Sequence, residues 1–421
     1  MEQLSIYFIN KQSNNKDNIE IKDDNIIIRI YIMNLSNHMI VNQINNINNI
    51  FKLYKNIKKI NIAFDKNINN KDINKILTKV HDITYSYNNK IHYEYKIYNV
   101  DSKTKKILKY LDQYKDIVMD PNKTQDTYVK WIEKQIPSNY NHSIKKTTDK
   151  FFPLTNSVGK GSNYDSYCVH IFPKKIDKNK KNIYLIGKSV IYDSGGINIK
   201  GANMYEMKVD MIGSGIIITV LKLLATNNMD KNYNIHLLIP VVENMISSKA
   251  TRPGTIIKSM SGTTVEIINT DAEGRLCMAD CIDYINMNLL NNTDDNLIID
   301  IATLTGNTIY ISGGISTIAM CNNTGTKYMN KMQDIGEDIG EYIDVLKIRD
   351  EYNDSLYSNV ADIKNCDYNN KAGCVTAGLF LKYFVGNNTP WIHLDVASST
   401  YKKDMICSHG VNLLYQFISD L

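Results

Sequence analysis

The sequence predicts an α/β protein with two domains, and three observations support this assignment. Short β-rich runs alternate with amphipathic helical runs through most of the chain, which is typical of α/β proteins. The apolar runs after about residue 180 are nearly continuous, as in parallel strands that are covered on both faces. The 421 residues are enough for two domains, at roughly 150 residues per domain. We therefore expect a C-terminal domain with a mostly parallel central sheet flanked by helices, and a smaller N-terminal α/β domain.

The first part of the chain contains four β-rich runs and two amphipathic helical runs. We expect strands at residues 4–10, 25–33, 58–65 and 90–100, and helices at residues 43–55 and 71–82. Residues 102–135 have helical periodicity, which Pro121 interrupts. The polar segment 137–151 predicts a linker. We therefore place the domain boundary near residue 145, which divides the chain into domains at residues 1–145 and 146–421.

The second part of the chain repeats the alternation with more apolar strands. We expect a strand and a loop at residues 182–196, a buried helix at 209–228, strands at 234–244, 264–268 and 296–306, and a helix at 274–290. Strands of this kind, separated by helices, indicate a parallel sheet covered on both faces. In such sheets, ligands bind at the carboxyl ends of the strands.

Net charge and cysteine usage limit the classes of function. The formal net charge is +5, but the positive residues are scattered, which makes nucleic acid an unfavoured partner. The seven cysteines have no repeating CxxC spacing and suggest no disulfide framework, which favours a reducing compartment. The sequence has no N-terminal signal pattern and no run of about 18 apolar residues. We therefore expect a cytoplasmic protein with no membrane partner.

Charged residues gather at or near the ends of the predicted C-terminal strands. The set consists of Lys188, Asp193, Lys200, Asp210, Asp271, Glu273 and Arg275, with Asp210 inside the predicted buried helix. Four carboxylates at one edge of a sheet would repel one another unless positive charge lay between them. Carboxylate oxygens are suitable ligands for Mg²⁺, Mn²⁺ and Zn²⁺. Four of them are enough to hold two ions with bridging ligands, an arrangement used in metal-dependent hydrolysis.

Each of these residues also has a purely structural explanation. A single Asp at a strand end is more often a helix N-cap or a turn residue than a metal ligand. The DSGG sequence at 193–196 is a turn signal, and Glu273 would suit the first turn of a helix. These explanations treat each residue singly. They do not explain why every one of these charged residues either follows an apolar strand or faces such a strand from a helix. The joint pattern therefore favours a metal site.

Five segments between about residues 180 and 415 carry a resemblance to a known family. They are NTDAEGRL at residues 269–276, which is highly specific, and GKSVIYDSGGINIK, EMKVDM, RPGTIIKSMSG and DIATLTG. Together they resemble the leucyl (cytosol) aminopeptidase family, whose members are dinuclear-metal and usually hexameric peptidases. The resemblance implies a metal-dependent aminopeptidase that assembles as a homohexamer.

The resemblance also implies two metal sites. Lys188, Asp193, Asp210 and Glu273 resemble the ligands of the tightly held metal. Asp193, Asp271 and Glu273 resemble those of the exchangeable metal, so Asp193 and Glu273 would bridge the two ions. A lysine ligand must lose a proton from a pKa of ~10.4, which burial next to a dication permits. The expected ions are Zn²⁺ and/or Mn²⁺, with Mg²⁺ or Co²⁺ as alternatives.

Catalytic and substrate-binding roles follow from the same resemblance. Lys200 would polarise the scissile carbonyl and stabilise the developing oxyanion. Arg275 resembles the family arginine that holds bicarbonate, which carries a proton from water to the leaving amine. The residues expected around the peptide substrate are Met207, Asn269, Thr303, Leu304, Gly306, Ala397 and Thr400, with Asn269 positioning its loop. An apolar pocket that contains methionine would favour Leu, Met or Phe at the N-terminus of the peptide.

Two alternatives to an aminopeptidase remain open. A non-catalytic oligomeric scaffold, or a nucleic-acid-binding member of the family, would not need Lys200 or Asp210, and both are present. A dipeptidase acting on Cys-Gly is not separated from an aminopeptidase by the pocket residues alone. A zincin-type protease is disfavoured because no histidine lies in an HExxH pattern. We interpret His393, Cys277 and Cys281 as core residues.

Overall fold

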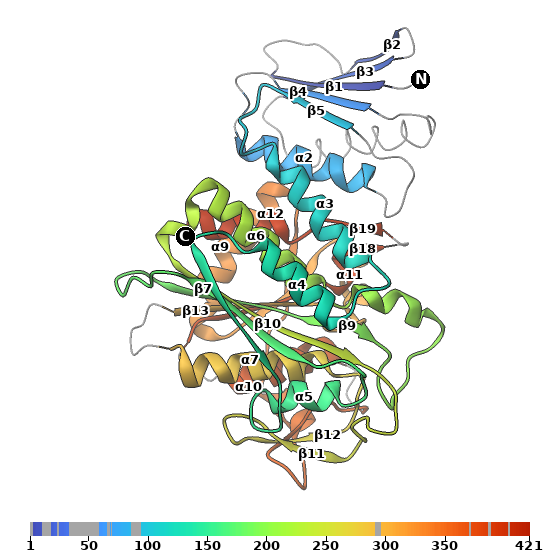
Figure 1. Ribbon diagram of the computed structural model, residues 1–421, viewed down its shortest axis with the longest axis vertical. Coiled ribbons are helices and arrows are strands. Elements are labelled where there is room, and N and C mark those ends of the chain that lie inside the picture. The colour runs from blue at the N-terminus through green and yellow to red at the C-terminus, as the bar shows by residue number, and fades with distance from the viewer. Residues whose placement is uncertain are drawn as a thin grey trace.

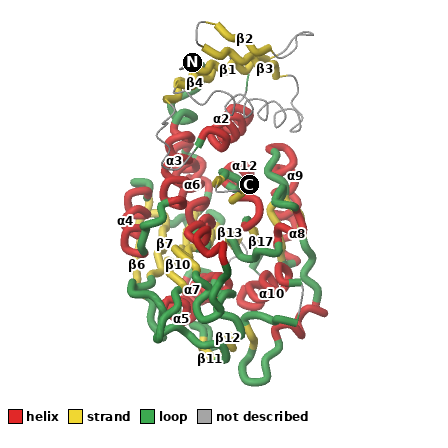
Figure 2. Tube along the Cα trace, turned by 90° about the vertical axis from the view of Figure 1, so that its right-hand side faces the viewer, coloured by secondary structure: helices red, strands yellow, loops and turns green. Residues whose placement is uncertain are grey.

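The computed structural model contains two main sheets, and helices pack around both (Figure 1). The N-terminal sheet lies at one end of the molecule, and the larger sheet with its helices forms the rest, as Figure 2 shows from a second direction. The described residues are 3–10, 18–22, 25–32, 59–64, 68, 70–85, 94–290, 296–369, 372–385, 389–402 and 405–421.

The N-terminal sheet has five strands in the order β2-β3-β1-β4-β5. Their bounds are β1 Gln3–Asn10, β2 Asn18–Lys22, β3 Asn25–Ile32, β4 Lys59–Phe64 and β5 Glu94–Tyr98. Neighbouring strands are parallel except for β2 and β3. The four predicted strands are confirmed, as is the helix predicted at 71–82, which is α2 (Asn70–Thr84). The helix predicted at 43–55 lies outside the described residues.

The larger sheet has nine strands, and its centre is parallel while its outer pairs include antiparallel ones. The strand order is β15-β14-β17-β13-β8-β10-β7-β6, and β9 also pairs with β10. The bounds are β6 Tyr140–Lys146, β7 Tyr167–Pro173, β8 Asn182–Gly187, β9 Ser189–Asp193, β10 Asn234–Asn244, β13 Asn296–Ala302, β14 Thr317–Cys321, β15 Ile343–Val345 and β17 Trp391–Asp395. The pairs among β17, β13, β8, β10 and β9 are all parallel. The predicted mostly parallel central sheet is therefore confirmed.

Helices cover both faces of this sheet. One core joins one face of the sheet to α3 (Lys106–Met119), α4 (Gln125–Gln135), α6 (Ile212–Asn227), α9 (Thr326–Ile339) and α12 (Val411–Asp420). A second core joins the other face to α5 (Pro153–Gly159), α7 (Gly274–Asn288) and α10 (Gly373–Val385). In β8, Ile183 and Leu185 belong to the first core, and Tyr184 and Ile186 belong to the second. Burial on both faces explains why this strand is apolar throughout.

A third sheet corrects one prediction from the sequence. The strand predicted at 264–268 forms β12 (Thr264–Ile267), but it does not join the central sheet. It pairs instead with β11 (Thr255–Lys258) and β16 (Ile363–Lys364). Only Val265 and Ile267 of this strand are buried, and such alternation suits a sheet with one covered face.

Short helices and strands complete the fold. They are the 3₁₀ helices η1 (Ala202–Val209), η2 (Met229–Asn232), η3 (Asn323–Gly325) and η4 (Asp350–Leu356), the helices α8 (Thr308–Ser312) and α11 (Ala397–Thr400), and the strands β18 (Tyr401–Lys402) and β19 (Met405–Ile406).

The segment 137–151, which was expected to be a linker, contains strand β6 instead. This strand pairs antiparallel with β7 at the edge of the large sheet, and most of its residues are partly or fully exposed. Its polar composition reflects this edge position, because an edge strand faces solvent. Of the helices before it, α4 packs against β10 of the same large sheet, and α3 packs against α6, which covers that sheet. We therefore propose that the domain boundary lies between Tyr98 and Lys106.

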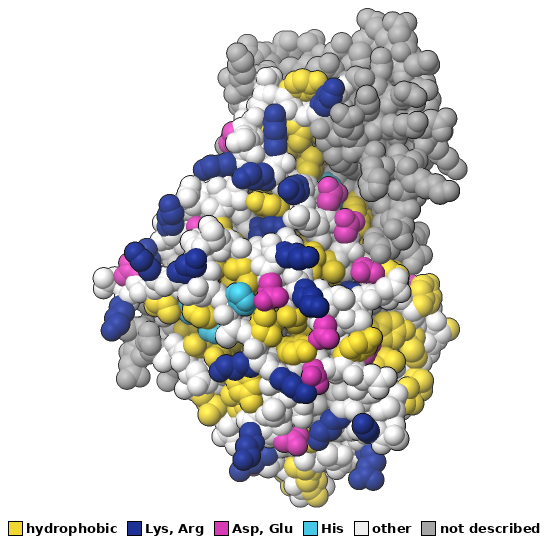
Figure 3. Space-filling view, viewed as in Figure 1, with side chains coloured by type: hydrophobic (Ala, Val, Ile, Leu, Met, Phe, Trp, Pro, Cys, Tyr) yellow, Lys and Arg dark blue, Asp and Glu magenta, His cyan; other side chains and the backbone are white. Residues whose placement is uncertain are grey.

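The long apolar stretch of the fold lies in its interior. Among the described residues, one helical stretch, Ala202–Asn227, is long and apolar enough to cross a membrane, and 83% of its most apolar window is buried inside the protein. On the described part of the face shown in Figure 3, Lys and Arg side chains are interspersed with apolar and acidic ones.

Candidate metal and substrate site

Lys188 interrupts the strand that runs from β8 into β9, and its side chain is buried at the carboxyl end of the sheet. Its backbone N–H donates to Ile301 O at 2.9 Å, and its carbonyl accepts from Ser214 N at 3.0 Å. A side chain at position 274 would put its Cβ 2.5 Å from Lys188 Cε. The glycine in the NTDAEGRL motif therefore makes room for the buried lysine.

Asp193 ends β9 and is fixed by the residues around it. Gly195 N and Asn244 Nδ2 both donate to Asp193 Oδ1, at 2.9 and 2.8 Å. Gly195 and Gly196 both have positive φ, which permits the tight turn that follows. Lys200 N donates to Ser194 O at 2.9 Å, so the loop returns and brings the Lys200 side chain back to Asp193.

Asp210 lies in a turn between η1 and α6, not inside a helix as the sequence suggested. Its N–H donates to Met207 O at 3.3 Å in a 3₁₀ pattern, and its carbonyl accepts from Val190 N of β9 at 3.2 Å. The second contact directs that carbonyl to the sheet, which explains why the α-helix begins only at Ile212. The Asp210 side chain accepts from Thr303 Oγ1 at 2.7 Å.

Asp271 and Glu273 follow β12 in a loop that leads into α7, and Arg275 lies in the first turn of that helix. Asp271 N donates to Asn269 Oδ1 at 2.8 Å, so Asn269 helps to shape this loop. Thr270 Oγ1 donates to Gly195 O at 2.7 Å and joins this loop to the one after β9. Although β12 belongs to a separate sheet, its loop therefore reaches the carboxyl end of the central strands.

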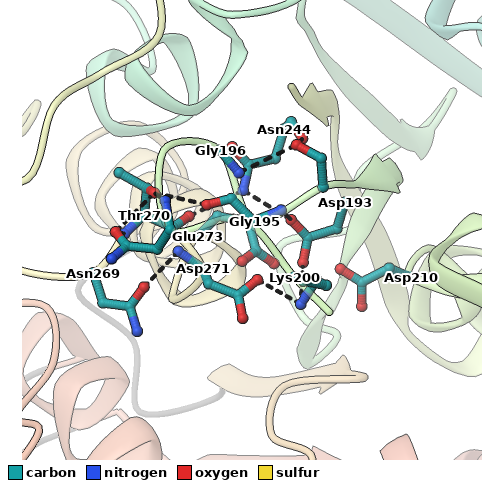
Figure 4. A network of polar contacts seen from close by, with 12 residues as sticks. Asp193, Gly195, Gly196, Lys200, Asp210, Asn244, Asn269, Thr270, Asp271 and Glu273 are labelled. Carbon is teal, nitrogen blue, oxygen red and sulfur yellow. Dashed lines mark hydrogen bonds and ion pairs between the residues drawn. The ribbon is translucent and has the colours of Figure 1, made fainter. Parts of the chain in front are cut away.

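These segments bring four carboxylates and two lysines together, as Figure 4 shows for all of them except Lys188. Lys188 Nζ lies 2.8 Å from both Asp210 Oδ2 and Glu273 Oε1, and 3.1 Å from Thr303 O. Lys200 Nζ lies 2.8 Å from Asp193 Oδ2 and 2.5 Å from Asp271 Oδ1. Ligand atoms of Asp193, Asp210 and Glu273 all lie within 4.8 Å of one another.

Burial and mutual repulsion perturb the pKa values of these groups. Burial, and then the charges of Glu273 and Asp210, raise the pKa of Asp193 well above its usual value. Burial also raises the pKa of Asp210, to about 7, although Lys188 opposes the shift. In contrast, the pKa of Glu273 is lowered, because the neighbouring Lys188 and Lys200 outweigh its burial. A cluster with these properties stabilises cations placed among its carboxylates.

Arg275 is buried beside this cluster with few partners. Its Nη1 donates to Asn365 O at 2.9 Å, and within the described part of the chain its Nε has no hydrogen-bond partner. Burial lowers the pKa of the guanidinium despite the nearby Glu273 and Asp395. A buried guanidinium with free donor capacity is suited to holding an anion.

The cluster lies in an open cavity of about 720 Å³. Five of the seven expected substrate residues line it, namely Met207, Thr303, Leu304, Gly306 and Ala397. Asn269 and Thr400 do not line it. Thr400 is fully buried, and its Oγ1 donates to Val396 O at 2.7 Å, so it lies behind the wall.

The cavity also has lining and supporting residues that the sequence did not reveal. Ser398 and Tyr401 line it, and they come from a segment far along the chain from the motif residues. Asp395 joins two parts of the wall by accepting from Leu304 N at 3.0 Å and from Ala397 N at 3.3 Å. Asn244 and Asp395 each end a central strand, so the rule that ligands bind at strand ends could have identified both.

The residues interpreted as core residues are buried. Cys277 and Cys281 pack in the second core. His393 is fully buried, and its Nδ1 pairs with Asp300. The core interpretation is confirmed for all three, but the expectation that His393 is fully hydrogen-bonded is not, because its Nε2 has no hydrogen-bond partner among the described residues.

Comparison with known proteins assigns the chain to a family. The family model described as "Cytosol aminopeptidase family, catalytic domain" matches residues 109–413, well over half of the chain. The chain belongs to the cytosol aminopeptidase family. The resemblance inferred from the five sequence segments is therefore confirmed, and the candidate site falls within the catalytic domain that the cytosol aminopeptidase family shares.

Individual cytosol aminopeptidases match over part of their length. A probable cytosol aminopeptidase of Clostridium tetani is 41% identical over 246 residues, which are 58% of this chain and 49% of that protein. The cytosol aminopeptidase of Rickettsia prowazekii is 35% identical over 272 residues, which are 62% of this chain and 53% of that protein. The chain thus spans about half the length of the curated relatives that it matches.

Solved structures share the fold over the whole chain. The leucine aminopeptidase LAP1 of Caenorhabditis elegans has a TM-score of 0.85 at 21% identity, covering 100% of this chain and 95% of that one. The bottromycin maturation enzyme BotP in complex with Mn has a TM-score of 0.81 at 18% identity, covering 100% of this chain and 99% of that one. The predicted fold class, with its α/β architecture, is therefore confirmed.

Proposed function

We propose that this protein is a metal-dependent aminopeptidase that hydrolyses the N-terminal peptide bond of peptides. The observation that carries the proposal is the buried cluster of four carboxylates and two lysines on the wall of an open cavity. Membership of the cytosol aminopeptidase family supports the reaction class. Hydrolysis adds water across the bond between the N-terminal residue and the rest of the peptide.

The carboxylate cluster fits two divalent cations. In the structure, each lysine ammonium lies between two carboxylates and partly balances their charge. Lys188, Asp193, Asp210 and Glu273 would hold one ion, and Asp193, Asp271 and Glu273 the other. Carboxylate oxygens suit Mn²⁺ and Zn²⁺, and also Mg²⁺ or Co²⁺. The neighbour BotP, which was solved in complex with Mn, is consistent with this class of ion.

Metal binding at Lys188 would be linked to pH. The nearby Asp210, Glu273 and Asp193 outweigh burial and raise the pKa of the Lys188 ammonium. The amine must lose this proton before it can bind a metal, so binding would release a proton and become tighter as pH rises. When bound, two divalent ions lower the pKa of a water molecule and polarise a carbonyl oxygen.

The cationic side chains of the site have separate roles in this proposal. Lys200 is partly exposed to the cavity, with 22% of its side chain accessible, so its ammonium can reach a substrate. It would polarise the scissile carbonyl and stabilise the negative charge that develops on its oxygen. Arg275 would hold bicarbonate, which when bound can carry a proton from water to the leaving amine. Its buried Nε, which has no hydrogen-bond partner among the described residues, supports an anion there.

The wall of the cavity would set the substrate preference. Met207 and Ala397 provide apolar surface for the first side chain, which favours Leu, Met or Phe. Leu304 and Gly306 lie where they can meet the peptide backbone. Thr303 is engaged by Lys188 and Asp210 and would orient the metal ligands more than the peptide. Thr400 would act from behind the wall, by supporting it.

We further propose a homohexamer, as the resemblance implied, and a cytoplasmic location, as the cysteine usage suggested. The names of the relatives, which are cytosol aminopeptidases, support the location. Light scattering on the purified protein would test the assembly. A stable and fully active monomer would overturn that part of the proposal.

Hydrolysis of a panel of aminoacyl-coumarin amides tests the proposed activity. The purified protein is assayed with added Mn²⁺, Co²⁺ or Zn²⁺, with a chelator as the control. Metal-dependent release that favours Leu, Met or Phe is the expected result. No release from any amide, with metal bound, would overturn the proposal, and a Cys-Gly substrate would then distinguish a dipeptidase from a non-catalytic scaffold.

A further inference from the structure

A buried contact joins the N-terminal domain to the segment that forms one wall of the substrate cavity. This wall is formed by Ala397 and Ser398 of α11 and by Tyr401. Helix α2 lies between the N-terminal sheet and the helices α3 and α12 (Figures 1 and 2). Asp82, near the end of α2, accepts hydrogen bonds from Ser408, which is 326 positions away in the sequence. We propose that Asp82 is a positioning residue that sets the side-chain preference of the cavity through Ser408. This inference rests on the proposed aminopeptidase function.

Asp82 is held by a network of buried partners. Its Oδ1 accepts from Ser408 N at 2.9 Å, from Ser408 Oγ at 2.8 Å and from Lys115 Nζ at 2.7 Å. The Lys115 and Ser408 residues are fully buried, and only 14% of the Asp82 side chain is exposed. Hydrogen bonds to a buried, charge-paired carboxylate are stronger than neutral ones and fix their partners in place. The position of Ser408 is therefore determined by a residue of the N-terminal domain.

The residue before Ser408 transmits this constraint to the wall. Cys407 N donates to Thr400 O at 2.9 Å, and Cys407 Sγ donates to Ser399 O at 3.0 Å. Ser399 and Thr400 belong to α11, whose other members Ala397 and Ser398 line the cavity. Cys407 therefore supports this wall through its hydrogen bonds to α11. Cys407 is adjacent in the chain to Ser408, whose position is fixed by the two hydrogen bonds that it donates to Asp82.

The other side of Ser408 has a second anchor. Glu341, a buried residue of the catalytic domain, accepts from Gly410 N at 2.7 Å and from Leu413 N at 3.2 Å at the start of α12. The start of α12 is therefore also held by a residue of the catalytic domain, although α12 packs against α2 as well. A change at Asp82 would act mainly on the segment before Ser408, which is the segment that supports the wall.

The position of this wall predicts which kinetic parameter a change at Asp82 would affect. The segment carries Ala397, one of the apolar residues proposed to contact the first side chain, and none of the four clustered carboxylates. A looser wall would weaken the fit of a large N-terminal side chain and leave the reacting groups in place. We therefore expect a change in KM and in selectivity, with little change in kcat.

Two variants and a matched control test the inference in the full-length protein. Asp82→Asn removes the charge, and the milder Ser408→Ala removes one hydrogen bond while leaving the pair with Lys115 intact. The control is Asp112→Asn, because Asp112 Oδ1 lies 2.7 Å from His81 Nε2 and joins the same helices, α2 and α3, whereas the N–H and hydroxyl of Ser408 donate to Asp82. Each variant is assayed with leucyl and alanyl amides, and by hydrogen–deuterium exchange of residues 397–410.

For Asp82→Asn we expect the KM for the leucyl amide to rise about threefold to tenfold, with kcat changed less than about twofold. The preference for the leucyl over the alanyl amide should fall by at least about threefold, and Ser408→Ala should show a smaller shift in the same direction. Residues 397–410 should exchange faster in both variants and not in the control. A loss of folded protein alone would lower kcat equally for both amides and would leave KM and the preference unchanged.

The outcomes separate this inference from the proposed function. If the wild-type protein cleaves amides but neither variant changes KM, preference or exchange, the role of Asp82 is overturned and the aminopeptidase proposal stands. If the wild-type protein cleaves no amide, the proposed function fails, and the exchange measurement still decides whether Asp82 positions the wall. Faster exchange in both variants would support that role, and exchange equal to the wild type would refute it.

Discussion

Replacement of Lys200 by methionine is the most direct test of the proposed chemistry. Methionine keeps much of the length of the lysine side chain but removes its charge. In the structure the ammonium contacts Asp193 and Asp271 at 2.8 and 2.5 Å, so it is held at the carboxylate cluster and does not move freely in solvent. An ammonium fixed in this way can act on an oxyanion without first being reorganised.

The expected size of the effect follows from Coulomb's law. A unit charge about 4 Å from a developing oxyanion contributes about 4 kcal/mol at an effective dielectric constant of about 20. Each ~1.36 kcal/mol changes a rate tenfold, so Lys200→Met should lower kcat by about 10²–10³. The KM should change much less, because the oxyanion charge exists only in the transition state.

The assay measures turnover of a leucyl-coumarin amide with Mn²⁺, together with the metal content of each variant. Lys208→Met is the matched control, because Lys208 lies on the 3₁₀ helix η1, which follows Lys200 in the chain, but it contacts the ring of Tyr205 and does not line the cavity. It should retain wild-type turnover. A Lys200→Met variant with full metal content and a kcat within tenfold of the wild type would refute the electrophilic role of Lys200.

Three further predictions concern other parts of the molecule. Asn244→Ala removes the donor to Asp193 and should weaken metal binding about 10–100-fold, as measured by metal titration, and unchanged affinity would contradict a supporting role for Asn244. Arg275→Ala should abolish any stimulation of turnover by bicarbonate, and persistent stimulation at intact metal content would argue against that site. Burial raises the pKa of Asp280 to about 8, so the folded protein keeps a proton that the unfolded chain loses near pH 4. The free energy of unfolding should therefore fall as pH rises from about 4 to 8, and Asp280→Asn, which can still accept from Thr155 N, should reduce this fall in urea titrations.

The sequence alone was sufficient to predict the alternation of strands and helices and to identify the charged residues that form the cluster. Hydrophobic periodicity is a local property, so the strand at 234–244 could be predicted to the residue, and the helix at 71–82 to within two residues. The five motif segments gave the family, which the catalytic-domain match confirmed. The rule that ligands bind at strand ends grouped Asp193 and Glu273 before any distance was known.

Predictions failed where the outcome depended on which segments are neighbours in space. The strand at 264–268 was placed in the central sheet, but it pairs with β11 and β16, and no local pattern specifies a partner strand. Asp210 was placed in a helix, but a contact from Val190 directs its carbonyl to the sheet. The polar segment 137–151 was interpreted as a linker because an exposed edge strand and a loop have similar composition.

The sequence by itself thus determined which residues carry charge and which elements they follow. Only the tertiary structure decided that Lys188 lies between Asp210 and Glu273, that Thr400 lies behind the cavity wall, and that the wall is linked to the N-terminal domain. The physical reason is the range of the interactions. Helix and strand formation depends on residues a few positions apart, whereas these contacts join segments up to 326 positions apart and exist only after the sheet has brought them together.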